Sequence, residues 1–255
     1  MRIVIIGTGN VARVLFERIG RTTHEVVQVV GRRPDVDGYF AATSYVDKLS
    51  LVDQSADLYL VAISDNALYE LPGQLRLPGC TVAHTAGSVR ADVLREVSGA
   101  YGVLYPLQTL RAGITGPEVV MPLLVDGADE VVIGRLETFS RDLSVLVRRA
   151  CDAERQRLHL AAVVVNNFTN HLYDTAARFC ESAGTDFRLL LPLIEQTALQ
   201  LRNFPPHLLQ TGPARRGDTR TLQKHEELLQ QHDSLRELYI FLSKAIANQH
   251  GHGGS

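Results

Sequence analysis

The chain has 255 residues, of which 45% are hydrophobic, so it can form one large domain or two modest ones with a substantial core. Its 26 basic and 28 acidic residues give a formal net charge of -2, which offers no electrostatic reason to expect nucleic acid or an acidic membrane as partner. The three cysteines are far apart and odd in number, which favours a reducing compartment, and we expect a cytoplasmic protein without a disulfide framework or metal site. We expect no signal peptide, because the N-terminal apolar run is only four residues long and ends in glycines. We expect no membrane span, because no apolar stretch is long enough to cross a bilayer.

The N-terminus combines a short apolar run with a pair of glycines. Residues 3–6 predict a buried strand, Gly7 permits a tight turn, and a helix is expected to begin at once. The bare backbone at Gly9 would let a pyrophosphate approach, where the N–H groups and dipole of a helix N-terminus favour anions. The pattern therefore predicts a dinucleotide site, with a bare structural turn as the alternative, formed by Gly7, Thr8, Gly9, Asn10 and Val11.

Short apolar runs alternate with helical stretches through the first half of the chain. Strands separated by helices of this length favour an α/β fold with a doubly wound parallel Rossmann sheet, which we expect over residues 1–152. The later strands are predicted at residues 26–30, near 45, and at 57–63, 80–84, 102–105, 122–125 and 145–148. Helices are predicted near residues 11–19, after residues 64–66, and over residues 129–143.

The second half has a helical pattern throughout. Apolar residues at three- and four-residue spacing predict one long helix over residues 154–182. Two further helices are expected after an N-cap at Asp218 and at a capping box that begins at Ser234. We therefore expect an all-helical domain over residues 153–248, followed by a disordered tail over residues 249–255.

Two arginines, Arg32 and Arg33, follow the second predicted strand, about twenty residues after the glycine turn. An acidic residue at this place would hold the ribose hydroxyls of NAD, whereas arginine accommodates the 2′-phosphate of NADP. The pattern favours NADP as cofactor, with NAD as the second choice. The alternative is a pair of solvated arginines on a turn.

Polar residues follow three predicted strands at the points where those strands end. Because ligands bind beyond the carboxyl ends of strands in open parallel sheets, these residues are candidates for a site. Ser64 and Asp65 are expected beside the nicotinamide half of the cofactor, or as a plain helix cap. His84 and Ser88 could orient a substrate or relay a proton, and residues 105–109 offer another polar cluster.

Asn166 and Asn170 lie inside the long predicted helix, four residues apart and therefore on one face. Asparagine is a poor residue inside a helix, and its amide is costly to bury without a partner. Either these amides bind a ligand or they satisfy backbone groups in the core. Together with His84 and Ser88 they are the candidate catalytic residues, and no metal-ligand cluster is expected.

Five motifs stand out together: Gly7-Thr8-Gly9-Asn10-Val11-Ala12, His84-Thr85-Ala86-Gly87-Ser88, Tyr105-Pro106-Leu107-Gln108-Thr109, Asn167-Phe168-Thr169-Asn170, and Thr211-Gly212-Pro213 with Arg216-Gly217-Asp218. Their combination resembles one bacterial family that joins a Rossmann-like domain to a helical C-terminal domain of unknown function. The resemblance extends to about Ala247. That family is similar in build to the pyrroline-5-carboxylate reductases and the 6-phosphogluconate dehydrogenase-like enzymes. The resemblance implies an NADP-dependent oxidoreductase with a small-molecule substrate, whose helical domain forms a homodimer and completes the active site.

One position departs from the wider group, whose hydroxyacid dehydrogenases carry a catalytic lysine four residues before an asparagine. If Asn170 is that asparagine, Asn166 replaces the lysine, and an amide cannot act as a general base near neutral pH. The expected reaction is therefore hydride transfer between NADPH and a small carbonyl, imine or amino compound, with His84 or a hydroxyl as proton donor. The alternatives are a nucleotide-binding sensor or interaction protein without turnover, and a structural dimerisation protein.

Overall fold

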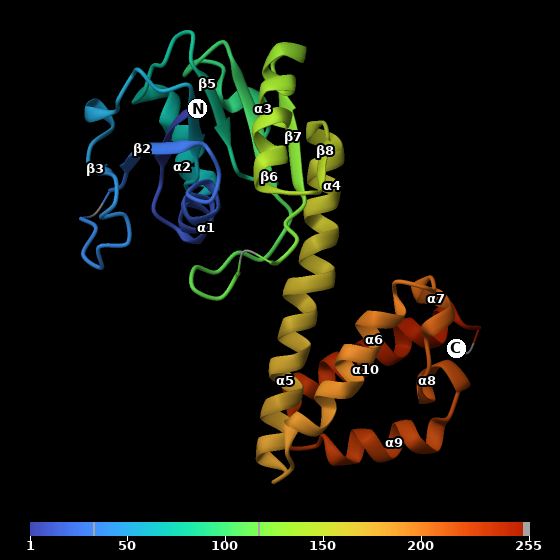
Figure 1. Cartoon of the computed structure of the whole chain (residues 1–255). Coiled ribbons are helices and arrows are strands. Elements are labelled where there is room, and N and C mark those ends of the chain that lie inside the picture. Colours follow the sequence, from blue (N-terminus) through green and yellow to red (C-terminus); the bar gives the residue numbers. More distant parts are fainter. Residues whose placement is uncertain (33, 117, 252–255) are drawn as a thin grey trace. The chain divides into compact units, whose positions relative to one another are not determined.

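The computed structural model describes residues 1–32, 34–116 and 118–251. The chain divides into two compact units, Met1–Asn166 and Asn167–Ser255, which are shown in Figure 1. Arg33 and the last four residues of the predicted tail lie outside the described residues. None of the helices in the described ranges is long and apolar enough to span a membrane.

The first unit contains an eight-stranded sheet with the strand order β3-β2-β1-β4-β5-β6-β7-β8 (Figure 1). The order of the first six strands is that of a Rossmann sheet, which confirms the predicted fold class. The strands are β1 (Arg2–Ile6), β2 (Glu25–Val30), β3 (Ser44–Val46), β4 (Leu58–Val61), β5 (Thr81–His84), β6 (Tyr101–Pro106), β7 (Leu123–Gly127) and β8 (Val147–Arg149).

The last two strands run against the others. β7 pairs with β6 in the antiparallel direction, and β8 pairs with β7 in the parallel direction. The prediction of a fully parallel sheet is therefore wrong for β7 and β8. A parallel neighbour would need a crossover, usually a helix, whereas the described residues between Pro106 and Leu123 form no helix.

Alternate residues of β1 enter two separate cores, one on each face of the sheet. Ile3 and Ile5 pack with residues of α1 (Asn10–Ile19) and α3 (Glu130–Leu143). Val4 and Ile6 pack on the other face, with Leu68 of α2 (Asp65–Glu70) and with residues of the short 3-10 helices. Burial of each such side chain stabilises the fold by about 1.5–3 kcal/mol. The 3-10 helices of this unit are η1 (Leu49–Leu51), η2 (Leu71–Gly73) and η3 (Ala91–Leu94).

A continuous helical run leads from the first unit into the second. It consists of α4 (Asp152–Ala162), a π-helical stretch (Val163–Phe168) and α5 (Thr169–Ser182), so the long helix is confirmed. Gly184 follows it with φ +68°, the left-handed conformation that ends many helices. The π-helical stretch was not expected from the sequence.

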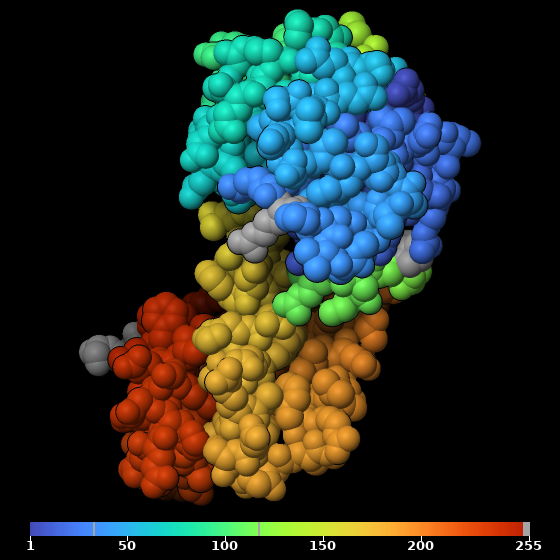
Figure 2. Space-filling model, turned by 90° about the vertical axis from the view of Figure 1, so that its left-hand side faces the viewer, coloured from blue at the N-terminus to red at the C-terminus, as the bar shows by residue number. Residues whose placement is uncertain are grey.

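The second unit is helical, as predicted. The side chain of Asp218 accepts a hydrogen bond from Thr221 N at 3.1 Å, which confirms the N-cap. The capping box at Ser234 is wrong, because α10 starts at Asp233 and His232 is its N-cap. Figure 2 shows the gold atoms of α5 between the red segment that holds α10 and the orange segment that holds α6. The helices are η5 (Phe187–Leu190), α6 (Leu191–Gln200), α7 (Pro206–Leu209), α8 (Pro213–Arg216), α9 (Thr219–Leu228) and α10 (Asp233–Gln249).

Candidate functional site

The turn between β1 and α1 has a shape that requires glycine. Gly7 has φ +123°, and a Cβ atom there would collide with the backbone carbonyl of Ala62, just beyond β4. Gly9 is the N-cap of α1, and a Cβ atom there would meet nothing within 4 Å. The N-cap of α1 therefore carries no side chain, and the space beside its Cα atom is open. This arrangement fits a dinucleotide pyrophosphate, which needs close backbone approach at a helix N-terminus.

The other predicted residues of this turn hold it in place. Asn10 Oδ1 accepts a hydrogen bond from Ala112 N at 3.2 Å, which ties the start of α1 to the loop after β6. Light-green atoms of that loop lie along the edge of the first unit in Figure 2. A Cβ atom on Gly31 would come within 2.7 Å of the Thr8 methyl group, so β2 and the turn are in close contact. Val11 is half-buried and packs on the core.

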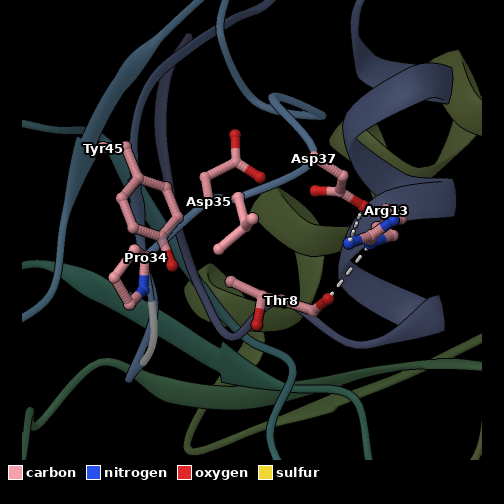
Figure 3. Close-up of a pocket in the computed structure, with 7 residues that line it drawn as sticks. Thr8, Arg13, Pro34, Asp35, Asp37 and Tyr45 are labelled. Atoms are coloured by element: carbon pink, nitrogen blue, oxygen red, sulfur yellow. Dashed lines mark hydrogen bonds and ion pairs between the residues drawn. The ribbon is translucent and has the colours of Figure 1, made fainter.

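A pocket of about 520 Å³ opens beside this turn, at the ends of β1 and β2 (Figure 3). Arg13 is the cation of the pocket. Its Nη2 lies 2.8 Å from the carboxylate of Asp37, and its guanidinium carbon lies 4.4 Å from the ring centroid of Tyr39. The pocket is lined by Thr8, Arg13, Pro34, Asp35, Val36, Asp37 and Tyr45.

The two carboxylates of the pocket already have partners. Asp35 accepts hydrogen bonds from the backbone N–H groups of Tyr39 and Phe40, at 3.2 and 2.8 Å. The hydrogen bond from Arg13 lowers the pKa of Asp37. Arg32 is exposed and is not among the lining residues. Arg13 was not among the residues predicted from the sequence, although a basic residue in the first turn of the helix after a glycine turn was a signal for it.

A second group of polar side chains lies at the carboxyl ends of β4 and β5. The hydroxyl of Ser88 donates a short hydrogen bond to the carboxylate of Asp65. The structure therefore joins a residue predicted to contact the cofactor to one predicted to contact the substrate. Gln156 Nε2 donates to the carbonyl of Ser88 at 3.0 Å and links this group to α4. Ser64 occupies the N-cap position of α2, but its side chain makes no cap hydrogen bond.

His84 lies within this region but is completely buried. Its Nδ1 accepts a hydrogen bond from Ala86 N at 3.2 Å, so its Nε2 carries the proton and donates to the carbonyl of Arg90 at 3.1 Å. Burial, aided by the charge of Arg155, lowers the pKa of His84 to about 4. A neutral imidazole with both nitrogens engaged holds the loop after β5. This geometry does not suit the role of proton donor that was predicted for His84.

A different imidazole faces the strand ends. His159 Nδ1, on α4, forms a 2.8 Å hydrogen bond with the hydroxyl of Tyr105 near the end of β6, and the two rings are nearly perpendicular. Gly87 packs against both, since a Cβ atom there would lie 2.7 Å from His159 Nδ1 and from Tyr105 Cζ. Burial raises the pKa of Tyr105, so its hydroxyl keeps its proton at neutral pH.

Arg155, one turn before His159, is completely buried. It donates to the carbonyl of Val89 at 2.5 Å and to the carboxylate of Asp152 at 2.6 Å, while its Nη1 lies 3.7 Å from Asp126. Its Nε and Nη1 atoms have no hydrogen-bond partner among the described residues. The guanidinium therefore fixes α4 against the loop after β5 and places a positive charge near the pair of Tyr105 and His159.

The two predicted asparagines have different surroundings. Asn166 donates a short hydrogen bond to the hydroxyl of Thr109, in the loop after β6. It lies in the π-helical stretch, where i→i+5 hydrogen bonds replace the α-helical pattern. The four-residue rule that placed it on one face with Asn170 does not hold there. Asn170 is exposed and belongs to α5 in the second unit.

His159 was not among the site residues predicted from the sequence. The available signal was the four-residue spacing of Arg155 and His159, which puts two basic side chains on one face of the predicted helix. Its partner Tyr105 was part of a polar cluster recognised at a strand end. Which strand end α4 would meet depends on tertiary structure, so the pair itself could not be found.

Comparison with known proteins identifies the family. Residues 121–246 match the family described as a domain of unknown function, DUF2520. The whole chain is similar to the crystal structure of a provisionally assigned NADP oxidoreductase from Bacteroides fragilis. The identity is 31%, the TM-score is 0.88, and the match covers 97% of this chain and 98% of that one. The chain belongs to the Rossmann-like oxidoreductase family with a helical C-terminal domain.

Two more distant structures share the fold of this oxidoreductase family. An imine reductase from Streptomyces aurantiacus has 12% identity and a TM-score of 0.69, over 97% of this chain and 96% of that one. A 1-pyrroline-5-carboxylate reductase from Streptococcus pyogenes has 16% identity and a TM-score of 0.64, over 97% and 98%. At these identities the likeness concerns the fold alone. No curated protein matches the chain.

Proposed function

We propose that the protein is an NADP-dependent oxidoreductase that transfers a hydride between NADPH and a small carbonyl, imine or amino compound. The observation that carries this proposal is the open backbone of the turn at Gly7 and Gly9, in a chain 31% identical to a provisionally assigned NADP oxidoreductase. The dinucleotide, when bound, supplies the hydride chemistry. The chain's own residues would bind the dinucleotide, orient the substrate and protonate it.

The proposed roles are those predicted from the sequence for the cofactor and the substrate. Arg32 and Arg33 would hold the 2′-phosphate, which favours NADP over NAD. Ser64 and Asp65 would lie beside the nicotinamide. The substrate would contact Ser88, which hydrogen-bonds to Asp65, and Asn166, which hydrogen-bonds to Thr109. Asn170 remains a predicted substrate contact. The pyrophosphate would rest on Gly7, Thr8, Gly9, Asn10 and Val11.

The phosphate assignment is tested by the substitution Arg32→Ala. A hydrogen bond to a charged group contributes about 1.5–3 kcal/mol, so loss of the guanidinium should weaken NADPH binding roughly 10- to 100-fold. NADH binding should change little, because NADH lacks the 2′-phosphate. Isothermal titration calorimetry with both nucleotides measures the two dissociation constants.

Arg141→Ala is the matched control, since Arg141 is an exposed arginine on α3 and should leave both affinities unchanged. Equal weakening of NADPH and NADH by Arg32→Ala would contradict the role of Arg32. If the wild-type protein takes up neither nucleotide, the proposed oxidoreductase function is wrong.

We also infer that the second unit associates with a second copy of the chain. Among its described residues only Ala214 and Leu229 are buried, so the unit by itself has almost no core. Large apolar side chains are instead open to solvent, and such patches mark association surfaces. A twofold homodimer is the commonest arrangement that would cover them. They include Leu189, Leu193, Phe204, Leu208, Leu228 and Phe241.

A further inference from the structure

We propose that Tyr105 and His159 form the proton-transfer pair of this enzyme. The hydroxyl of Tyr105 delivers the proton to the nitrogen or oxygen of the substrate, and His159 replaces it. This inference rests on the proposed hydride transfer and adds the residues that complete it.

Tyr105 and His159 meet at the edge of the sheet where the parallel strands end. Tyr105 lies near the carboxyl end of β6, one strand away from the loop that holds Ser88 and two strands away from Asp65. Ligands of open α/β sheets bind at this edge. The 2.8 Å hydrogen bond joins the pair directly, and both side chains are half-buried, so a substrate can reach them while bulk water is partly excluded. His84, the other imidazole here, has no free ring nitrogen.

The substrate carbon receives a hydride, with its two electrons, from the proposed reductant NADPH, and the C=N or C=O π bond breaks. The O–H bond of Tyr105 then breaks as a new N–H or O–H bond forms on the substrate. The Nδ1–H bond of protonated His159 breaks in turn, and its proton passes to the Tyr105 oxygen. The neutral imidazole regains a proton from a hydronium ion or a buffer acid, so the reduction consumes one solvent proton in all, and the reverse sequence serves oxidation.

The surrounding charges suit this role. Burial raises the pKa of Tyr105, with a smaller contribution from the charge of Asp65, so the hydroxyl stays loaded with its proton. The charge of Arg155 acts in the opposite direction on Tyr105. A fixed cation of this kind stabilises the phenolate that forms transiently as the proton leaves. Gly87 leaves just enough room for the two rings to meet.

Tyr105→Phe is the decisive variant, because it keeps the ring and removes only the hydroxyl. We expect kcat for NADPH-dependent reduction of a panel of cyclic imines and 2-oxo acids to fall roughly 10²- to 10⁴-fold. The NADPH dissociation constant should not change. His159→Asn keeps an amide near the position of Nδ1 but cannot relay a proton, so kcat should also fall. Tyr101→Phe, the same change at the amino end of β6, should leave kcat unchanged.

A second readout does not depend on turnover. In protein labelled with ¹⁵N-histidine and free of nucleotide, the Nδ1 resonance of His159 should report its hydrogen bond. Tyr105→Phe should shift that resonance and Tyr101→Phe should not. Thermal melts followed by circular dichroism check that each variant is folded.

The outcomes separate this inference from the proposed function. Unchanged turnover or an unchanged His159 resonance in Tyr105→Phe would contradict the proposal that the two residues form a proton-transfer pair. A wild-type protein that binds NADPH but reduces no member of the panel also overturns its catalytic role. A protein that binds no NADPH overturns the proposed function, and the pair with it.

Discussion

His84 and Tyr105 both follow strands at the same edge of the sheet, yet their surroundings differ. His84 is completely buried with both ring nitrogens bonded, whereas Tyr105 is half-buried and bonded to a residue on α4. The sequence could place both at strand ends, because apolar runs and polar interruptions are visible in it. It could not tell which side chain turns inward, since that depends on the loop after β5 and on the helix that packs on it.

His84 should make the protein sensitive to acid. Its pKa is lowered to about 4 in the folded state from 6.5, so the unfolded chain takes up this proton first as the pH falls. The stabilisation is complete above pH 6.5 and is lost as the pH falls towards 4. The loss should amount to roughly 3 kcal/mol in the free energy of unfolding.

Urea unfolding across this pH range measures the effect. The variant His84→Gln should lose less free energy between pH 6.5 and pH 4 than the wild type, because only the protonation of this imidazole has been removed. His171→Gln, at an exposed histidine on α5, should show the same change of unfolding free energy with pH as the wild type. Identical slopes in all three proteins would show that His84 is not the group responsible.

At the scale of elements, the sequence predicted the existence of the strands and long helices well. The runs at residues 26–30 and 80–84 and the N-cap at Asp218 carry local signals that the fold preserves. The reversed direction of β7 has no such signal, since it is set by the connection and the neighbouring strand. The π-helical stretch was not predicted either, because its apolar spacing resembles that of an α-helix.

Two ion pairs involve residues of helix α4, and the buried pair should contribute more to the free energy of unfolding than the exposed one. Asp152 accepts from completely buried Arg155 at 2.6 Å and from Ala91 N at 3.0 Å. Asp152→Asn should therefore lower the free energy of unfolding by about 1.5–3 kcal/mol. Glu154→Gln removes the same charge from a more exposed pair with Arg148 and should cost less than about 1 kcal/mol. Chemical denaturation of both variants checks this, and equal losses would contradict the importance of burial.

At the scale of the whole molecule, the two units differ in how much of their apolar surface they cover. Two cores flank the sheet of the first unit, whereas the second exposes leucines and phenylalanines from most of its helices. The helical pattern of residues 153–248 showed that helices would form. It could not show where their apolar sides would be covered, because the partner proposed here is another chain.

The homodimer is tested by the substitution Phe241→Glu. Phe241 on α10 is 70% exposed, and a carboxylate at this place would oppose burial in an interface. We expect the wild type to sediment as a dimer in analytical ultracentrifugation and the variant to shift towards the monomer. Val145→Glu, at a 93% exposed valine of the first unit, should remain dimeric. A monomeric wild type would contradict the inference.

The reversed direction of β7 and β8 has a geometric consequence for the proposed proton-transfer pair. β8 leads the chain away from the ligand edge, so the helix that follows must travel back towards it. Seven residues, or about 10 Å of helix, then separate Asp152 from His159. If these two strands ran in the same direction as the others, α4 would begin at the carboxyl edge of the parallel strands and would run away from it. The reversed strands thus bring His159 from a distant part of the chain to Tyr105, its proposed partner in proton transfer.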